Sequence, residues 1–185
     1  MAFHMQMERS ERIAEGTEGV RGPRVEPSAV TFEAFFHEEY GRCLRALYLV
    51  TGNPHEAEEL AQDSFIAVWE RWDRVSQMEN PTGYLYRAAL NKHRSGLRRA
   101  TRAARRTLGM REGSDLFAAS DERDSVARAL ARLTPRQRET IVLVELLGYP
   151  AEEAGLILGI EPVTVRVHAS NARAAMKNLL EETDE

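Results

Sequence analysis

The residues of this sequence best suited to do chemistry lie near its C-terminus and are of the kinds that bind DNA. Residues 162–180 carry three basic side chains and no acidic one, a composition that favours contact with phosphate groups. The same stretch holds hydroxyl, imidazole, amide and aliphatic side chains, which match the polar and methyl edges of bases in the major groove. We predict base-edge contacts for Thr164, His168 and Asn171, contacts with thymine methyl groups for Val163 and Val167, and phosphate contacts for Arg166 and Arg173.

A second basic segment lies in the middle of the chain. Residues 80–111 contain nine Arg or Lys and no Asp or Glu. Aromatic rings beside basic groups can stack on unpaired bases and follow a phosphate chain, and an amide can read the edge of an unstacked base. This pattern predicts contact with opened DNA through Tyr84, Arg87, Asn91, Lys92, Arg94, Arg98 and Arg99. A solvated basic helix with its tyrosines in the core has the same composition and stays open as the alternative.

An acidic segment, residues 56–63, reads Glu-Ala-Glu-Glu-Leu-Ala-Gln-Asp. Glu59 and Asp63 are four residues apart and therefore share one face of a helix. Such a face suits a basic protein partner, because complementary charges steer and orient association. A merely solvated acidic face is the commoner situation and is the other interpretation.

The sequence lacks the patterns of a catalytic or metal site. Its five histidines are scattered, without a partner for general-base work, and no ligand cluster has metal-binding spacing. Cys43 is the only cysteine, which excludes an internal disulfide. We therefore expect a cytoplasmic protein that is not an enzyme and that has no metal, no cofactor and no small-molecule substrate.

The charge of the chain is unevenly distributed. The 185 residues have a formal net charge of −4, yet residues 31–79 contain ten acidic and four basic residues, in contrast to the two basic segments. This asymmetry predicts an acidic surface for a protein partner and two basic surfaces for phosphates. The apolar stretches are too short to cross a bilayer, and residues 1–9 lack a secretory signal, so we expect no membrane insertion.

The apolar residues recur at helical spacing, and none of the segments alternates with the period of a strand. The fold class expected is therefore all-α. Capping residues predict helices that begin after Thr31, Asn53, Asn80 and Thr134 and at Pro162, with a loop at residues 73–79. We expect two small helical domains at residues 31–99 and 125–182, a flexible linker at 100–124 and a flexible N-terminal extension at 1–30.

The C-terminal domain has the pattern of a helix-turn-helix. A helix over residues 150–158, a tight turn at Gly159 and a helix from Pro162 give the two crossing helices of this motif. We expect inward apolar residues at Val126, Ala129, Leu130, Leu133, Ile141, Val142, Leu146, Leu147, Ala154, Leu158, Ile160, Val165, Ala169, Ala172 and Met176. An ordinary helical hairpin with a solvated basic face is the alternative.

Taken together, these segments resemble the extracytoplasmic-function sigma factors, which consist of sigma regions two and four joined by a linker. The segment AEELAQDSFIAVW at 57–69 is similar to the helix of the family that binds core polymerase. The segment GYLYRAALN at 83–91, followed by Leu97-Arg98-Arg99, resembles the part that melts and reads the minus-ten element. LTPRQR at 133–138 and Thr164-Val165-Arg166 resemble the signature of region four.

The resemblance implies a sigma factor that binds core RNA polymerase and directs promoter-specific transcription initiation. It implies that Glu59, Gln62 and Asp63 face the clamp helices of the largest polymerase subunit. It implies that the basic helix binds the minus-ten element of promoter DNA and that the last helix binds the minus-thirty-five element. An anti-sigma protein is a further partner that the resemblance implies.

The sequence departs from the pattern of the family at several positions. Tyr84 occupies the place of a Trp, Ser95 that of an Asp, Ala154-Gly155 that of Ile-Ala, and Val167-His168-Ala169 that of Ser-Arg-Leu. We therefore do not expect this protein to recognise the same promoter sequence as other members of the family.

The alternative function is that of a LuxR-type helix-turn-helix transcription regulator, since residues 133–136 and 164–168 suit that family almost as well. Such regulators carry a receiver or ligand-sensing domain upstream, with strands. The upstream domain predicted here is all helical with a basic end, which favours the sigma factor.

Overall fold

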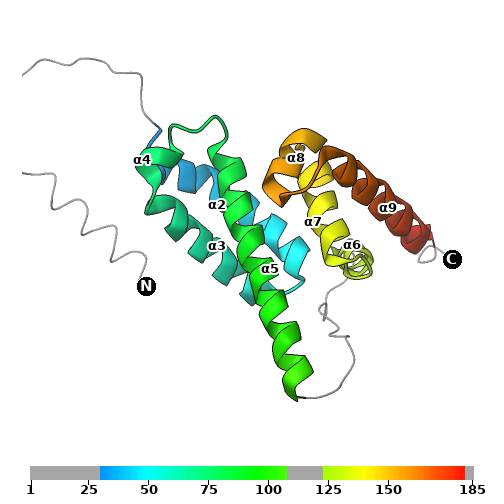
Figure 1. Cartoon of the computed structure of the whole chain (residues 1–185). Helices are drawn as coiled ribbons and strands as arrows, with labels where there is room; N and C mark the ends of the chain where they lie inside the picture. Colours follow the sequence, from blue (N-terminus) through cyan, green and yellow to red (C-terminus); the bar gives the residue numbers. More distant parts are fainter. Residues whose placement is uncertain (1–29, 108–122, 182–185) are drawn as a thin grey trace, which may run out of the picture.

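The computed structural model describes residues 30–107 and 123–181, and every regular element in these two ranges is a helix (Figure 1). This confirms the all-α expectation. The first half consists of α2 (Phe32–Thr51), α3 (Pro54–Trp69), α4 (Trp72–Val75) and α5 (Pro81–Thr107), and the second of α6 (Arg123–Ala131), α7 (Pro135–Ile141), the π-helix η1 (Val142–Leu146), α8 (Ala151–Leu158) and α9 (Pro162–Glu181). The predicted N-terminal extension, apart from Val30, and residues 108–122 of the predicted linker lie outside the described residues.

Local capping explains where the helices begin. The Thr31 hydroxyl accepts a hydrogen bond from the backbone N–H of Ala34 at 3.2 Å. The Asn53 side chain accepts from the N–H groups of the first turn of α3. Thr134 and Gln137 form a reciprocal capping box at the start of α7. Because each cap satisfies N–H groups that have no partner inside the helix, the predicted helix starts are confirmed at these three positions.

One boundary differs from the prediction, and one helix extends beyond its apolar pattern. The range 73–79, expected to be a loop, begins within the short helix α4, because Val75 turns inward and is fully buried. Helix α5 continues to Thr107, into the range expected to be linker. Residues 98–107 contain only Ala, Arg, Thr and no Gly or Pro. Alanine and arginine are strong helix formers, so the helix persists after its apolar pattern has ended.

The π-helix η1 changes which residues of the second half are buried. The N–H of Leu147 donates to the carbonyl of Val142, five residues back, which widens the turn. The register shifts by one position, so that Leu143 is buried whereas Leu146, predicted to point inward, is 51% exposed. Val126, also predicted to point inward, is 43% exposed, and Ala127 is buried beside it.

One hydrophobic core runs through both halves of the molecule. In the first half the rings of Phe35 and Phe65 lie 6.1 Å apart, and Phe35 lies 5.1 Å from Trp72. Helix α5 crosses the first half and contacts α8 of the second (Figure 1). Where the halves meet, Leu47 and Leu90 face Leu143 around a small gap. The two halves therefore share a common interior. Among the described residues no helix combines the length and apolar character that a membrane crossing requires.

Arg138 donates several hydrogen bonds in this interior. Its guanidinium is buried and donates to the carbonyls of Leu130, Ala131 and Leu133 at the end of α6. It also donates to the carbonyl of Val50 in α2, at 3.1 Å. Helix C-termini leave carbonyls without intrahelical partners, and this one side chain satisfies several of them. Burial lowers the pKa of Arg138.

We expect Arg138→Met to lower the free energy of unfolding by about 3 kcal/mol. The buried carbonyls would lose their charged hydrogen-bond donor, and methionine offers no donor in its place. Urea unfolding followed by circular dichroism measures this change. The matched control is Arg132→Met, since Arg132 is exposed and its replacement should change stability by less than about 0.5 kcal/mol. Equal effects of the two substitutions would contradict the structural role assigned to Arg138.

Candidate nucleic-acid and polymerase interface

The turn between α8 and α9 has the tight geometry of a helix-turn-helix. Gly159 adopts a left-handed conformation with φ of 68°, which favours glycine. The N–H groups of Gly159 and Ile160 both donate to the carbonyl of Gly155, at 2.8 and 3.1 Å. A Cβ atom at Gly155 would lie 2.8 Å from the Ile160 carbonyl oxygen, so glycine lets the turn approach α8 closely. The turn thereby fixes the direction in which α9 leaves.

Helix α9 has a buried face and an exposed face. Val165, Ala169 and Ala172 are buried against the rest of the second half. On the other face Val163 is 62% and Val167 52% exposed, although aliphatic side chains are costly to expose. Their exposure next to polar side chains suits a surface that binds the apolar parts of a ligand.

The structure brings all seven residues predicted on α9 to the accessible part of the helix. Arg166, Asn171 and Arg173 are exposed, and Thr164 and His168 are partly exposed. Arg166 pairs with Glu152 of α8, and the Arg173 Nε atom lies 2.8 Å from a carboxylate oxygen of Glu145 in η1. These two ion pairs, which sequence reasoning missed, are exposed and hence weak. A phosphate group can displace them.

Helix α5 divides the residues predicted to bind opened DNA between two environments. Tyr84 is partly buried and Arg87 is exposed, and both line a groove of about 520 Å³. The other wall of this groove comes from α8. Tyr86, in contrast, is 1% exposed and belongs to the core. Burial raises the pKa of Tyr86. The tyrosines therefore separate into one core ring and one accessible ring.

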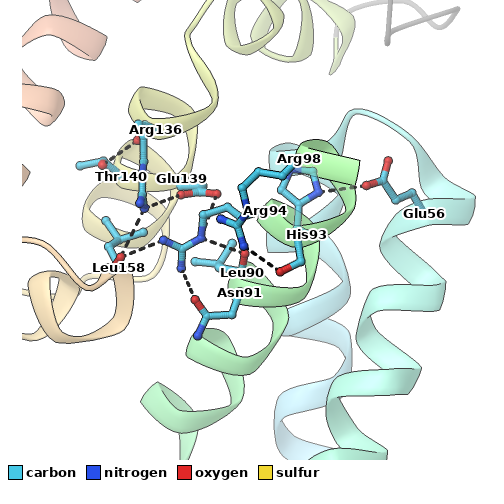
Figure 2. A network of polar contacts seen from close by, with 11 residues as sticks. Glu56, Leu90, Asn91, His93, Arg94, Arg98, Arg136, Glu139, Thr140 and Leu158 are labelled. Atoms are coloured by element: carbon cyan, nitrogen blue, oxygen red, sulfur yellow. Dashed lines mark hydrogen bonds and ion pairs between the residues drawn. The ribbon is translucent and has the colours of Figure 1, made fainter. Parts of the chain in front are cut away.

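Arg94 points toward the second half of the molecule and not toward solvent (Figure 2). Its Nη1 atom donates to the Leu158 carbonyl at 2.8 Å, and its Nη2 atom donates to the Asn91 side chain at 2.8 Å. Its Nε atom lies 3.8 Å from the Glu139 carboxylate. Burial lowers the pKa of Arg94, and the negative charge of Glu139 opposes this effect. Arg94 is thus engaged within the molecule, and the exposed Asn91 is hydrogen-bonded to it.

The other basic residues of the predicted set lie at the surface of α5. Lys92, Arg98 and Arg99 are exposed. Arg98 donates to the Ser95 hydroxyl at 2.9 Å, and Lys92 forms an ion pair with Asp63 of α3. This pair joins the basic helix to the acidic one.

The acidic residues predicted to contact polymerase are all exposed on α3. Gln62 donates to the Glu58 carboxylate at 3.4 Å, and Glu59 lies 3.6 Å from His55. Two carboxylates of the acidic segment contact α5: Asp63 pairs with Lys92, and Glu56 lies 2.9 Å from the buried His93. No group of ligand side chains able to hold a metal ion occurs among the residues that the structure describes.

Comparison with known proteins decides among the interpretations. Residues 35–103 match the family model for sigma-70 region 2, and residues 123–176 match the model for sigma-70 region 4. The chain is 30% identical over 159 residues to the RNA polymerase sigma factor NccH of Alcaligenes xylosoxydans xylosoxydans, covering 79% of this chain and 85% of that protein. The chain belongs to the extracytoplasmic-function sigma factors.

Other relatives agree with this assignment. The sigma factor is 29% identical over 164 residues to the ECF RNA polymerase sigma factor SigE of Mycolicibacterium smegmatis, covering 81% of this chain and 62% of that protein. Its fold matches that of the sigma factor RpoE, solved in complex with the anti-sigma factor NepR from Bartonella quintana, with a TM-score of 0.71 and 24% identity. This match covers 81% of this chain and 96% of RpoE.

The family membership establishes what the protein does. It is a sigma factor that binds core RNA polymerase and promoter DNA and directs promoter-specific transcription initiation. Sigma factors are regulators and not enzymes. The match of the first half to sigma region 2 separates it from a LuxR-type regulator, because region 4 alone resembles both.

We expect His168→Ala and Asn171→Ala to change which upstream promoter sequences the sigma factor prefers. Each lost base contact should remove about 1–3 kcal/mol of discrimination at one base pair. Transcription from a library of promoters with randomised upstream elements, in the presence of core polymerase, measures this preference. The control is Arg173→Ala, which should weaken all sequences about equally because phosphates carry no sequence information. If all three variants lost transcription to the same extent on every promoter sequence, base reading by His168 and Asn171 would be contradicted.

Proposed function

We propose that this sigma factor divides its work among three surfaces, each on a different helix. The exposed edge of α3 binds core polymerase, the basic face of α5 binds the minus-ten element, and the outer face of α9 binds the minus-thirty-five element. The observation that carries the proposal is the segregation of charge and exposure. The acidic side chains gather on α3, and the basic and base-matching side chains gather on α5 and α9.

The polymerase-binding surface consists of Glu59, Gln62 and Asp63. Their exposure and shared face support docking against the basic clamp helices of the largest polymerase subunit. Asp63 pairs with Lys92 of the minus-ten surface, so the two surfaces adjoin. This suits a protein that has to present opened DNA while bound to polymerase.

The minus-ten surface consists of Tyr84, Arg87, Asn91, Lys92, Arg94, Arg98 and Arg99. The accessible ring of Tyr84 can stack on an unpaired base, and the Asn91 amide can read the edge of a base. The exposed basic residues follow the phosphates. Asn91 is exposed, whereas Arg94 bonds to the second half, so Arg94 can reach DNA only if it gives up the Leu158 carbonyl.

The minus-thirty-five surface consists of the seven α9 residues, Val163, Thr164, Arg166, Val167, His168, Asn171 and Arg173. The exposed valines support contact with thymine methyl groups. The two arginines, whose present partners are exposed carboxylates, support phosphate contacts. This surface places the second half on duplex DNA upstream of the opened segment.

We further propose the limits of the parts and the setting in which they work. Sigma region two is assigned to residues 31–99, the linker to 100–124 and sigma region four to 125–182. The protein acts in the cytoplasm, where RNA polymerase is, and has no catalytic activity of its own. An anti-sigma protein regulates it, as supported by the fold shared with RpoE, which was solved in complex with NepR.

Reconstitution with purified core polymerase tests the proposed function. The folded protein should direct initiation at specific sites in a library of genomic fragments. Primer extension or sequencing of transcript ends locates these sites. Core polymerase without the protein is the control. Absence of specific initiation by the folded, core-bound protein would contradict the proposal.

We expect the double variant Glu59→Ala and Asp63→Ala to bind core polymerase at least tenfold more weakly, because two interfacial charges of about 1 kcal/mol each are lost. Fluorescence titration of labelled protein with core polymerase measures the affinity. The matched control is Glu33→Ala with Glu38→Ala, which removes two exposed acidic groups from α2. If the α3 variant bound core polymerase with unchanged affinity, Glu59 and Asp63 would not belong to the polymerase-binding surface.

A further inference from the structure

The C-terminal part of α5 carries a group of exposed arginines. Arg98, Arg99 and Arg102 are exposed, and Figure 1 shows this end of the helix projecting beyond the other helices. Arg98 and Arg102 are four residues apart, and Arg99 and Arg102 are three apart, so all three share one side of the helix. We call Arg98, Arg99 and Arg102 the distal arginines.

The positive charge of the distal arginines is not balanced by carboxylates. Elsewhere Lys92 pairs with Asp63, and the two arginines of α9 pair with glutamates. Within the described ranges no carboxylate forms an ion pair with a distal arginine. Arg98 donates to the Ser95 hydroxyl, and Arg102 donates to the Arg98 carbonyl at 3.3 Å. Because like charges at this spacing repel one another, a bound polyanion would stabilise this part of the helix.

The distal part of α5 lacks the groups that capture an opened strand. Residues 92–107 contain no Phe, Tyr, Trp, Asn or Gln, and their one ring, that of His93, is buried. Capture of unpaired bases relies on rings that stack on them. Arginines alone contact phosphates, which fix position on a duplex and carry no sequence information. The distal arginines therefore suit the backbone of paired DNA better than an opened strand.

The length of α5 sets how far the distal arginines lie from the opened DNA. An α-helix rises 1.5 Å per residue, so Arg98 and Arg102 lie about 21 and 27 Å along the axis from Tyr84. One strand of a duplex carries a phosphate every 3.4 Å of its axis, so these distances correspond to about six to eight base pairs. The chain continues from this end of α5 to the second half, whose α9 surface we assign to upstream duplex. The distal arginines therefore face the upstream side of the opened segment.

We propose that the distal arginines bind phosphates of the double-stranded promoter DNA between the minus-ten and minus-thirty-five elements. The inference rests on the proposed minus-ten function of α5. It adds Arg102 to the residues that bind DNA and assigns Arg98 and Arg99 to paired DNA. The contact holds the DNA between the two recognised elements against the protein and is independent of its sequence.

The test replaces Arg98, Arg99 and Arg102 together with alanine in the full chain bound to core polymerase. Alanine is a strong helix former, so α5 should persist. Each phosphate contact contributes about 0.9 to the slope of log affinity against log salt concentration, so three contacts contribute about 2.7. Between 50 and 200 mM salt, the unmodified protein should therefore lose about 40-fold more affinity than the variant. Fluorescence anisotropy of a labelled promoter duplex from which the unmodified protein initiates measures this difference.

Two further variants control for loss of charge and for contact geometry. Alanine at Arg45, Arg71 and Arg132 removes three exposed arginines outside the proposed surfaces and should leave the salt dependence unchanged. Lysine at the three distal positions should also preserve it, because a phosphate contact requires positive charge. The proposal is wrong if the alanine variant keeps the full salt dependence, if the control variant loses as much, or if lysine acts like alanine.

A second measurement locates the DNA beside the distal arginines. Thr101 is exposed and lies between them in the sequence, so Thr101→Cys can carry an iron-chelate reagent that cleaves nearby DNA. Cys43 has no exposed surface, and burial raises the pKa of its thiol to about 12, so it escapes labelling. Cuts are expected in paired DNA upstream of the opened segment, which permanganate oxidation of unpaired thymines delimits. Cuts confined to the opened segment, or no cuts upstream of it, would overturn the proposal.

This contact and the proposed function fail in different ways. Initiation by the unmodified protein with core polymerase reports the proposed function directly. Specific initiation together with an unchanged salt dependence of the alanine variant would reject the contact with paired DNA alone. Lack of specific initiation by the unmodified protein would reject the proposed function, and with it the contact that rests on it.

Discussion

Glu139 lies at the centre of the junction on which the arrangement of the two halves depends. Its carboxylate is fully buried, and a buried charge costs several kcal/mol unless charges of opposite sign surround it. Arg136 of its own half lies 3.3 Å away, and Arg94 of the other half approaches to 3.8 Å. Burial raises the pKa of Glu139, while Arg94, Arg136 and His93 act against this shift. The carboxylate is therefore best satisfied when the two halves are together.

Charge organises the surface of the protein as well as its junction. The net charge of −4 would argue against DNA binding if it were spread evenly. Instead, acidic residues gather on α3, and basic residues gather on α5. Ion pairs join acidic to basic residues within the free protein: Asp63–Lys92 joins α3 to α5, and Glu145–Arg173 joins η1 to α9. Exposed pairs are weak, so polymerase and DNA can replace them without a large energetic penalty.

Much of the fold was predictable because its signals are local. Thr31, Asn53 and Thr134 cap the helices that they were expected to begin, since a cap depends only on residues within one turn. The burial of Leu146 was predicted wrongly, because the π-helix shifts the register by one residue and leaves no clear mark in the sequence. The exposed face of α9 was predictable from its periodicity, whereas its ion pairs with Glu145 and Glu152 were not. Those partners are distant in the sequence.

The sequence by itself determined the helices, the helix-turn-helix and the membership in the sigma factor family, because periodicity, caps and motifs are properties of short segments. Only the tertiary structure decided that Arg94, which resembles the other basic residues of α5, turns inward. Its partners, Leu158 and Glu139, are distant from Arg94 in the sequence, and the residues next to Arg94 do not predict these contacts. Contacts between the two halves depend on how helices that are distant in the sequence pack together, and this packing is a property of the complete fold.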